Sequence, residues 1–163
     1  MNIRPATCAD IPFLMNLERQ CATAGHWTEA QYRQAFQGEG PNRLMIVSEA
    51  SNLVASDAIG AVNAASGVVL GFLIARHLAP EWELENIVVA PAAQGKAIGR
   101  RLLDALSAAA RETNSTSVFL EVRESNMAAR TLYEMARFKQ TGRRKSYYTD
   151  PAEDAILYRR TLP

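Results

Sequence analysis

The chain has 163 residues, of which 48% are hydrophobic and 21% charged, and its formal net charge at neutral pH is +1. This length and composition predict one globular domain over residues 1–163, and they exclude the disordered, collagen-like and membrane classes. A net charge so close to zero gives no general attraction to phosphate backbones, so we expect no nucleic-acid partner. No window approaches the apolar run needed to cross a bilayer, so we expect no membrane partner. Cys8 and Cys21 lack the spacing of a zinc site or a disulfide scaffold, which indicates a reduced, cytoplasmic compartment and no bound metal.

The first half of the chain predicts strands and two helices. Apolar residues recur at helical spacing after a short β-rich stretch, and Thr28 with Gln31 three residues later has the pattern of a capping box. The small, polar stretch over residues 49–67 is interpreted as an extended hairpin connection, with a little strand at Leu53–Val54. In chain order, the predictions are a strand over 3–6, a helix capped by Thr7 or Asp10, a helix from Thr28 to about Phe36, a turn over 38–42, and strands over 44–48 and 68–76.

The second half of the chain alternates strands with helices. The sharpest helix signal follows Ala90–Pro91, where leucines and alanines lie on one side of an amphipathic segment. In chain order, the predictions are a strand over 82–89, a helix from 99 to about 111, a strand over 117–122, a helix over 126–135, and strands over 139–143 and 155–160. The interleaving of strands and helices predicts an α/β sandwich around a mixed sheet.

The loop over residues 94–101 has the composition of a phosphate-binding turn. Gly95 and Gly99 remove side chains where a phosphate must approach the main chain, and Lys96 and Arg100 add positive charge. Free N–H groups at a helix start, together with the helix dipole, suit a pyrophosphate. Gly-containing loops with solvated basic residues are also common before helices, so the loop alone leaves both interpretations open. Neither GxxxxGK[ST] nor GxGxxG is present, which disfavours a nucleotide triphosphatase or a Rossmann dehydrogenase.

The run Glu85-Asn86-Ile87-Val88-Val89-Ala90-Pro91, followed by Gln94-Gly95-Lys96-Ala97-Ile98-Gly99, resembles the acetyl-CoA motif Q/RxxGxG/A of the GNAT acetyltransferases. This resemblance implies the GNAT fold, a mixed and mostly antiparallel sheet of six to seven strands flanked by about four helices. It implies acetyl-CoA as cosubstrate, with the strand's main chain on the pantetheine arm and the loop around the pyrophosphate. The cofactor-binding residues it implies are Ile87, Val88, Val89, Gln94, Gly95, Lys96, Ala97, Ile98, Gly99, Arg100 and Asn126. Ala97 departs from the family's usual glycine, and its methyl group would crowd the phosphate or oppose a positive φ.

The run Leu120-Glu121-Val122-Arg123-Glu124-Ser125-Asn126, with Ala128-Ala129-Arg130-Thr131-Leu132-Tyr133-Glu134, is similar to a narrower group of that family, which acetylates the N-terminal alanine of a small-subunit ribosomal protein. Further matches are His26-Trp27-Thr28-Glu29, residues 84–87, residues 143–148 and residues 153–156. The resemblance implies Glu121 as general base, Tyr133 as general acid, and direct transfer to a protein N-terminus in a ternary complex. Arg137 stands where the family normally has glycine, which would alter the turn after that helix.

The acid–base pair is chemically reasonable apart from the resemblance. An attacking amine must lose a proton and the departing thiolate must gain one, and a carboxylate and a phenol can supply both steps. An α-amino group has a pKa of about 8 against about 10.4 for lysine, which favours an N-terminal substrate. On spacing alone, Glu121 could instead be a surface carboxylate, Tyr133 a core tyrosine, and Asn126 only a helix cap.

The acceptor side of the expected site is acidic and aromatic. Glu81, Glu83 and Glu85 alternate along a predicted strand, so three carboxylates share one face, as either a cradle for a cationic N-terminus or an exposed strand end. A β-bulge near Asn86 would free main-chain groups for the cofactor. The residues expected to contact the peptide are Trp27, Glu85, Tyr147 and Tyr148. The basic run over 143–145 could suggest RNA, but such runs are usually solvated.

Two other functions stay open from the sequence: an acetyltransferase acting on lysine or on a small-molecule amine, and a non-catalytic acyl-CoA sensor. We expect the protein to be a monomer.

Overall fold

The computed structural model describes residues 1–21, 23–38, 42–50, 61–63 and 67–163. The strands are β1 (Asn2–Pro5), β2 (Arg43–Ala50), β3 (Ala61–Asn63), β4 (Gly67–Leu78), β5 (Glu81–Val89), β6 (Ser117–Arg123), β7 (Lys139–Thr149) and β8 (Ala152–Thr161). The helices are α1 (Ile11–Gln20), α2 (Glu29–Phe36), α3 (Ile98–Glu112) and α4 (Met127–Met135), with single 3₁₀ turns at Cys8–Asp10 and Pro91–Ala93. The little strand predicted at Leu53–Val54 lies outside the described residues.

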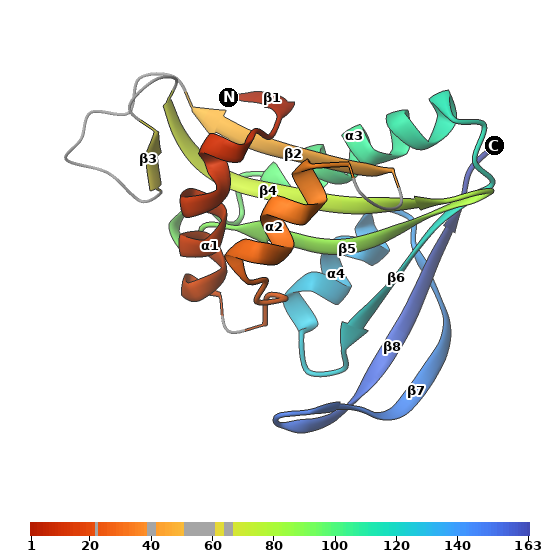
Figure 1. The fold of residues 1–163 in the computed structure, drawn as a ribbon. Coiled ribbons are helices and arrows are strands. Elements are labelled where there is room, and N and C mark those ends of the chain that lie inside the picture. Colours follow the sequence, from red (N-terminus) through yellow and green to blue (C-terminus); the bar gives the residue numbers. More distant parts are fainter. Residues whose placement is uncertain (22, 39–41, 51–60, 64–66) are drawn as a thin grey trace.

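The strands form one mixed sheet in the order β1-β2-β4-β5-β6-β8-β7, with the short β3 pairing only with β4. Every pairing is antiparallel except that of β5 with β6. Helices α1 and α2 cover one face of the sheet, and α3 lies on the opposite face (Figure 1). The predicted fold class, with about four helices around a mostly antiparallel sheet, is therefore confirmed. No helix in the described part of the chain is long and apolar enough to cross a membrane.

The core forms where helices cover both faces of the central strands. Strand β4 is buried continuously from Val68 to Ala75, as expected for a strand with no solvent-facing side. Helix α3 buries one stripe against the sheet, comprising Ile98, Leu102, Leu103, Leu106 and Ala110. The Thr28–Gln31 capping box is present at the start of α2, as predicted.

Two strand irregularities depart from simple alternation. Strand β7 extends to Thr149 rather than ending near residue 143, because register shifts after Gln140 and after Arg144 bend it without ending its pairing with β8. In β5, Asn86 lies opposite Ile74 and Leu84 lies opposite Ala75, which leaves one extra residue between them. The predicted bulge near Asn86 is therefore confirmed, with Glu85 as the extra residue.

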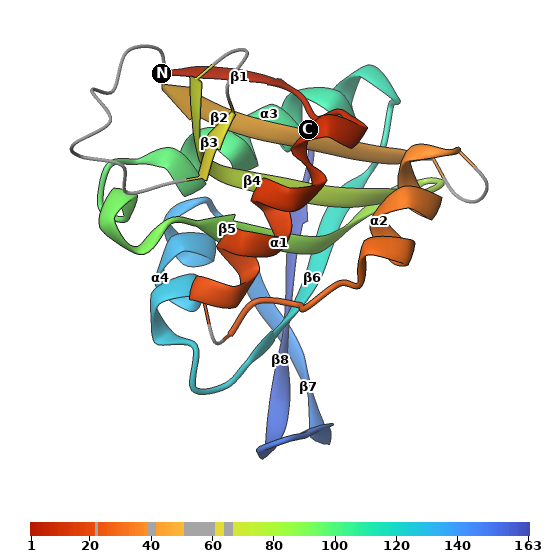
Figure 2. The same ribbon diagram turned by 60° about the vertical axis from the view of Figure 1, so that its left-hand side comes forward.

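Strands β5 and β6 diverge beyond their first residues. They pair only at Glu81–Ser117, Trp82–Val118 and Glu83–Phe119, although both strands continue well past these positions. Both ribbon views show β6 and β8 turning away from the β2–β4–β5 part of the sheet (Figures 1 and 2). The divergence leaves one edge of the carboxyl half of β5 without a neighbouring strand, and it separates the carboxyl ends of two parallel strands.

Candidate active site

A cleft of about 1250 Å³ opens where β5 and β6 diverge. Its walls come from the carboxyl half of β5, the loop before α3, the end of β6, helix α4, the tyrosines of β7, and residues 23–28, which we call the α1–α2 loop. The predicted site residues that line it are Trp27, Glu85, Ile87, Val88, Val89, Gln94, Gly95, Ala97, Ile98, Gly99, Arg100, Glu121, Asn126, Tyr133, Tyr147 and Tyr148. Lys96 is exposed beside the cleft and is outside this lining. Residues far apart in the sequence thus meet around one cavity.

The loop before α3 is shaped by two residues with positive φ. Gly95 has φ 76°, and a side chain added there would meet no atom within 4 Å, so its main chain is open to the cleft. Ala97, the N-cap of α3, has φ 58° and ψ 13°, so its methyl group does not prevent the left-handed conformation. The first N–H groups of α3 have no acceptor within the helix and lie at the positive end of its dipole. The loop therefore offers an anion several main-chain donors.

The end of β5 is held against this loop by close packing. The Val89 carbonyl accepts a hydrogen bond from Gln94 Nε2 at 3.3 Å and a contact from Cys21 Sγ at 3.7 Å. On the β4 side, a Cβ added at Gly71 would lie 2.7 Å from the Val88 carbonyl oxygen. Strand β4 therefore lies too close to β5 at Gly71 for any residue with a side chain to fit without a shift.

Glu121 points from β6 toward the cleft and is held there by residues of β7. Its Oε1 lies 3.0 Å from an Arg144 guanidinium nitrogen, and its side chain is 20% exposed. The Tyr147 phenol lies against the same carboxylate, which raises the pKa of Tyr147. Arg144 and Tyr147 both reach Glu121 because the bulge after Arg144 turns this part of β7. The sequence offered no local signal for the Arg144–Glu121 pair, since β8 lies between their strands.

Tyr133 is a buried residue that nevertheless lines the cleft. It is 5% exposed, and its ring packs against Phe138 and Tyr158. Burial, and secondarily the nearby Tyr148, raises the pKa of Tyr133, so the phenol keeps its proton at neutral pH. Asn126 is the N-cap of α4, with its side-chain oxygen accepting from the Ala129 N–H at 3.2 Å. The capping role considered for Asn126 is present, and the residue also lines the cleft.

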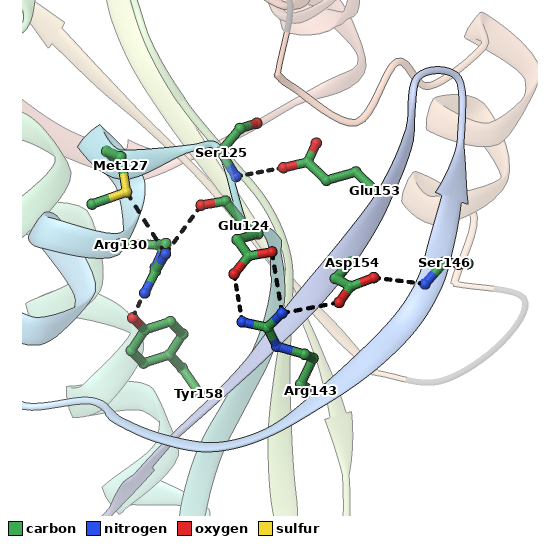
Figure 3. Close-up of polar contacts among 9 residues, drawn as sticks. All are labelled: Glu124, Ser125, Met127, Arg130, Arg143, Ser146, Glu153, Asp154 and Tyr158. Carbon is green, nitrogen blue, oxygen red and sulfur yellow. Dashed lines mark hydrogen bonds and ion pairs between the residues drawn. The ribbon is translucent and has the colours of Figure 1, made fainter.

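The loop between β6 and α4 is tied to the β7–β8 hairpin by ion pairs. Arg143 bridges Glu124 and Asp154, at 3.3 and 3.1 Å, and Asp154 also accepts the Ser146 N–H at 2.8 Å (Figure 3). On the other side of the hairpin, Glu153 accepts the Ser125 N–H. The hairpin therefore fixes the loop that carries Asn126.

The acidic face of β5 is neutralised by arginines from three other strands, β8, β4 and β2. The three pairs are Glu81 with Arg159, Glu83 with Arg76, and Glu85 with Arg43, the last at 2.8 Å. The carboxylates are thus neither an unpaired cradle nor a simply solvated strand end. Two residues of the basic run, Arg143 and Arg144, are likewise paired with carboxylates. Sequence reasoning missed these partners because each pair joins residues that become neighbours only through the sheet.

The mixed sheet, with a cleft where β5 and β6 diverge, agrees with the GNAT fold that the sequence resemblance implied, and comparison with known proteins supports the same class. The model of the acetyltransferase (GNAT) family matches residues 12–138, so the chain belongs to this family. Members of this family use acetyl-CoA as cosubstrate, in agreement with the resemblance of the loop motif.

Several relatives are acetyltransferases of protein N-termini. The chain is similar to the ribosomal protein bS18-alanine N-acetyltransferases of Haemophilus influenzae, at 39% identity over 55% of this chain and 62% of the relative, and of Escherichia coli K12, at 38% over 56% and 64%. It is 45% identical to the N-alpha-acetyltransferase RimI of Mycobacterium tuberculosis over 49% of each chain. These matches span less than two thirds of the relatives' length.

Solved structures extend the likeness to the whole chain. The ribosomal-protein-S18-alanine N-acetyltransferase of Escherichia coli superposes with a TM-score of 0.75 at 28% identity, covering 99% of this chain and 93% of that one. Arabidopsis thaliana NAA60 in complex with acetyl-CoA superposes with a TM-score of 0.79 over 99% and 98% of the two chains. At 14% identity, the NAA60 match shows the fold alone.

Proposed function

We propose that this chain transfers the acetyl group of acetyl-CoA to the N-terminal α-amino group of a protein, with the N-terminal alanine of a small-subunit ribosomal protein as the substrate. The observation that carries the proposal is the convergence of Glu121 and Tyr133 on the cleft that also receives the loop before α3. The names of the relatives support the choice of substrate. A ribosomal substrate would place the reaction in the cytoplasm, and residues 1–163 would act as one acetyltransferase domain.

The residues of the cleft fit acetyl-CoA. The main chain of residues 94–100 and the start of α3 would hold the diphosphate, because Gly95 leaves its backbone open and the helix start presents free N–H groups. The edge of β5 at Ile87–Val89, which has no β6 partner, would bond the amides of the pantetheine arm. The bound cosubstrate supplies an acetyl group as a reactive thioester.

The proposed acid and base would complete the proton balance of the transfer. Glu121 would take one proton from the substrate ammonium, directly or through water, which frees the amine nitrogen to bond to the acetyl carbon. The nitrogen then carries a second surplus proton, which would return to the Tyr133 phenolate through water after that phenol has protonated the sulfur. Tyr133 would donate its phenolic proton to the sulfur as the carbon–sulfur bond breaks. The raised pKa of Tyr133 supports this role, because the group must be protonated when the thiolate leaves. Neither step needs a covalent enzyme intermediate.

The test uses peptides that separate the possible acceptors. One peptide has a free N-terminal alanine, a second has a blocked N-terminus and one internal lysine, and a small aliphatic amine serves as the third acceptor. We expect acetylation of the first peptide at its α-amine, detected by mass spectrometry. Acetylation of lysine or the small amine alone would contradict the proposal. Binding of acetyl-CoA with no acetylated product would indicate a non-catalytic sensor.

Glu121→Gln tests the base within the same assay. We expect turnover to fall about 100-fold at neutral pH, with a smaller loss above pH ~8, where the α-amine is already deprotonated. The matched control is Glu29→Gln, because Glu29 is an exposed carboxylate on α2 that pairs with Arg33 and is outside the cleft lining. An equal loss at every pH, or an equal loss in the control, would count against Glu121 as base.

A further inference from the structure

We call the part of the cleft lined by Trp27, Glu85, Tyr147 and Tyr148, which are expected to contact the peptide, its acceptor end. The proposed reaction gives no role to one buried carboxylate near this end. Glu18, on α1, is 2% exposed. Its Oε1 accepts a hydrogen bond from Asn86 Nδ2 at 2.7 Å, and its Oε2 accepts the Trp27 N–H at 3.1 Å. Among the described residues, no arginine or lysine forms an ion pair with it. Instead, neutral donors from two separate segments converge on this carboxylate.

These hydrogen bonds join the α1–α2 loop to β5. The Asn86 amide group that reaches Glu18 also donates to the Gly25 carbonyl at 3.0 Å, and Asn86 is itself buried. Gly25 packs against this amide, since a Cβ added at Gly25 would lie 3.7 Å from Asn86 Nδ2. Gly25, Trp27 and Asn86 all line the cleft. Glu18 therefore bonds both walls of the cleft, which the Asn86–Gly25 hydrogen bond also joins directly.

The same contacts extend to the residues expected to meet the peptide. The Trp27 ring packs against the Tyr32 ring, with centroids 5.4 Å apart, and the Arg43 guanidinium lies over its face at 5.8 Å. Arg43 in turn pairs with Glu85, the extra residue of the β5 bulge. Trp27 and Glu85 are thus connected through Arg43, and Glu18 accepts the main-chain N–H of Trp27.

We propose that Glu18 is a positioning residue for the acceptor peptide, which holds the α1–α2 loop against β5 and so sets the width of the acceptor end of the cleft. This inference rests on the proposed function. The inference concerns the acceptor alone. The loop before α3 and the start of that helix would hold the diphosphate, and among the described residues neither forms a hydrogen bond with Glu18.

Glu18→Gln separates this role from a contribution to folding. Burial raises the pKa of Glu18, although the Tyr32 hydroxyl, the Trp27 N–H, His26 and Asn86 oppose that effect. The Tyr32 hydroxyl is outside ordinary hydrogen-bond geometry with the carboxylate. Glutamine keeps the size of the side chain and removes a buried charge, so the core should still fold. Its amide, however, has one acceptor oxygen in place of two, so its NH2 group must face either Asn86 Nδ2 or the Trp27 N–H, and one of the two hydrogen bonds is lost.

The experiment compares the wild-type chain, Glu18→Gln and the control Glu29→Gln. Glu29 lies on the neighbouring helix, where it is exposed and forms an i,i+4 pair with Arg33. The first readout is iodide quenching of tryptophan fluorescence without substrate. The chain has two tryptophans, and Trp82 is 3% exposed, so quenching reports on Trp27. We expect a larger quenching constant in Glu18→Gln and a wild-type value in the control.

The second readout is steady-state kinetics with the alanine peptide. In Glu18→Gln we expect the peptide KM to rise about tenfold, since a hydrogen bond to a charged group corresponds to about that factor in affinity, with the acetyl-CoA KM unchanged. Unchanged quenching, an unchanged peptide KM, or an equal rise in both KM values would overturn the inference. A wild type and control that acetylate no peptide would instead overturn the proposed function, and the acceptor role with it.

Discussion

Replacing Ala97 by glycine tests how the loop before α3 accommodates a residue with a side chain. Ala97 has φ 58° and ψ 13°, and an L-residue in this left-handed region costs roughly 1–2 kcal/mol. Glycine removes that cost, but its greater freedom in the unfolded chain offsets roughly 0.5–1 kcal/mol. We therefore expect Ala97→Gly to raise the free energy of unfolding by about 0.5–1 kcal/mol, which corresponds to about 2 °C in Tm for a chain of this length.

The same substitution should leave acetyl-CoA binding almost unchanged. Ala97 adopts the left-handed conformation as the N-cap of α3, so we expect the same strain in the free and the bound protein, and it then cancels in the affinity. Urea denaturation measures the gain in stability, and titration calorimetry with acetyl-CoA measures the Kd, which we expect to stay within about twofold of the wild-type value.

Arg137→Gly is the matched control for this prediction. Arg137 has φ 66° and follows α4, where the Phe138 N–H bonds the Tyr133 carbonyl and the Arg137 N–H bonds the Glu134 carbonyl, both at 2.9 Å. This Schellman motif usually has glycine at that position, and Arg137 does not line the cleft. Both variants should gain similar stability. A destabilised Ala97→Gly, or a tenfold change in its Kd with none in the control, would refute the reasoning.

Three further substitutions probe the strand, the core and the proposed acid. Gly71→Ala should destabilise the fold by about 1–3 kcal/mol and weaken acetyl-CoA binding, because the new Cβ would lie 2.7 Å from the Val88 carbonyl oxygen. Wild-type values of the free energy of unfolding in denaturation and of the Kd in calorimetry would contradict this. Burial raises the pKa of Asp10, but its hydrogen bonds with Arg4 and Thr7 outweigh burial and leave that pKa below its usual value. The carboxylate therefore stabilises the fold at neutral pH, and this stabilisation is lost as the pH falls below about 4. Asp10→Asn should therefore cost about 3 kcal/mol at pH 7 and flatten the loss of stability in acid, and an unchanged acid transition would exclude this explanation. Tyr133→Phe should slow turnover about 100-fold with an unchanged Kd for acetyl-CoA, since the ring packing is kept, and a wild-type rate would rule out Tyr133 as the acid.

Features encoded by neighbouring residues were predictable from the sequence. The capping box of α2 joins Thr28 and Gln31, only three residues apart, and it forms as predicted. The position of the loop over residues 94–101 was predictable, because apolar residues recur with a period of two in the strand before it and of about 3.6 in the helix after it. The order of the helices and of the longer strands and the fold class therefore followed from local patterns and family resemblance.

Contacts between distant segments were decided only by the tertiary structure. Glu121 meets Arg144 across β8, and Glu18 meets Asn86, which is 68 residues away in the chain. The arginine partners of the β5 carboxylates and the full length of β7 depend on strand order, register and bulges. A shift of one residue in register would turn these side chains to the other face of the sheet, and local periodicity contains no information about which register forms.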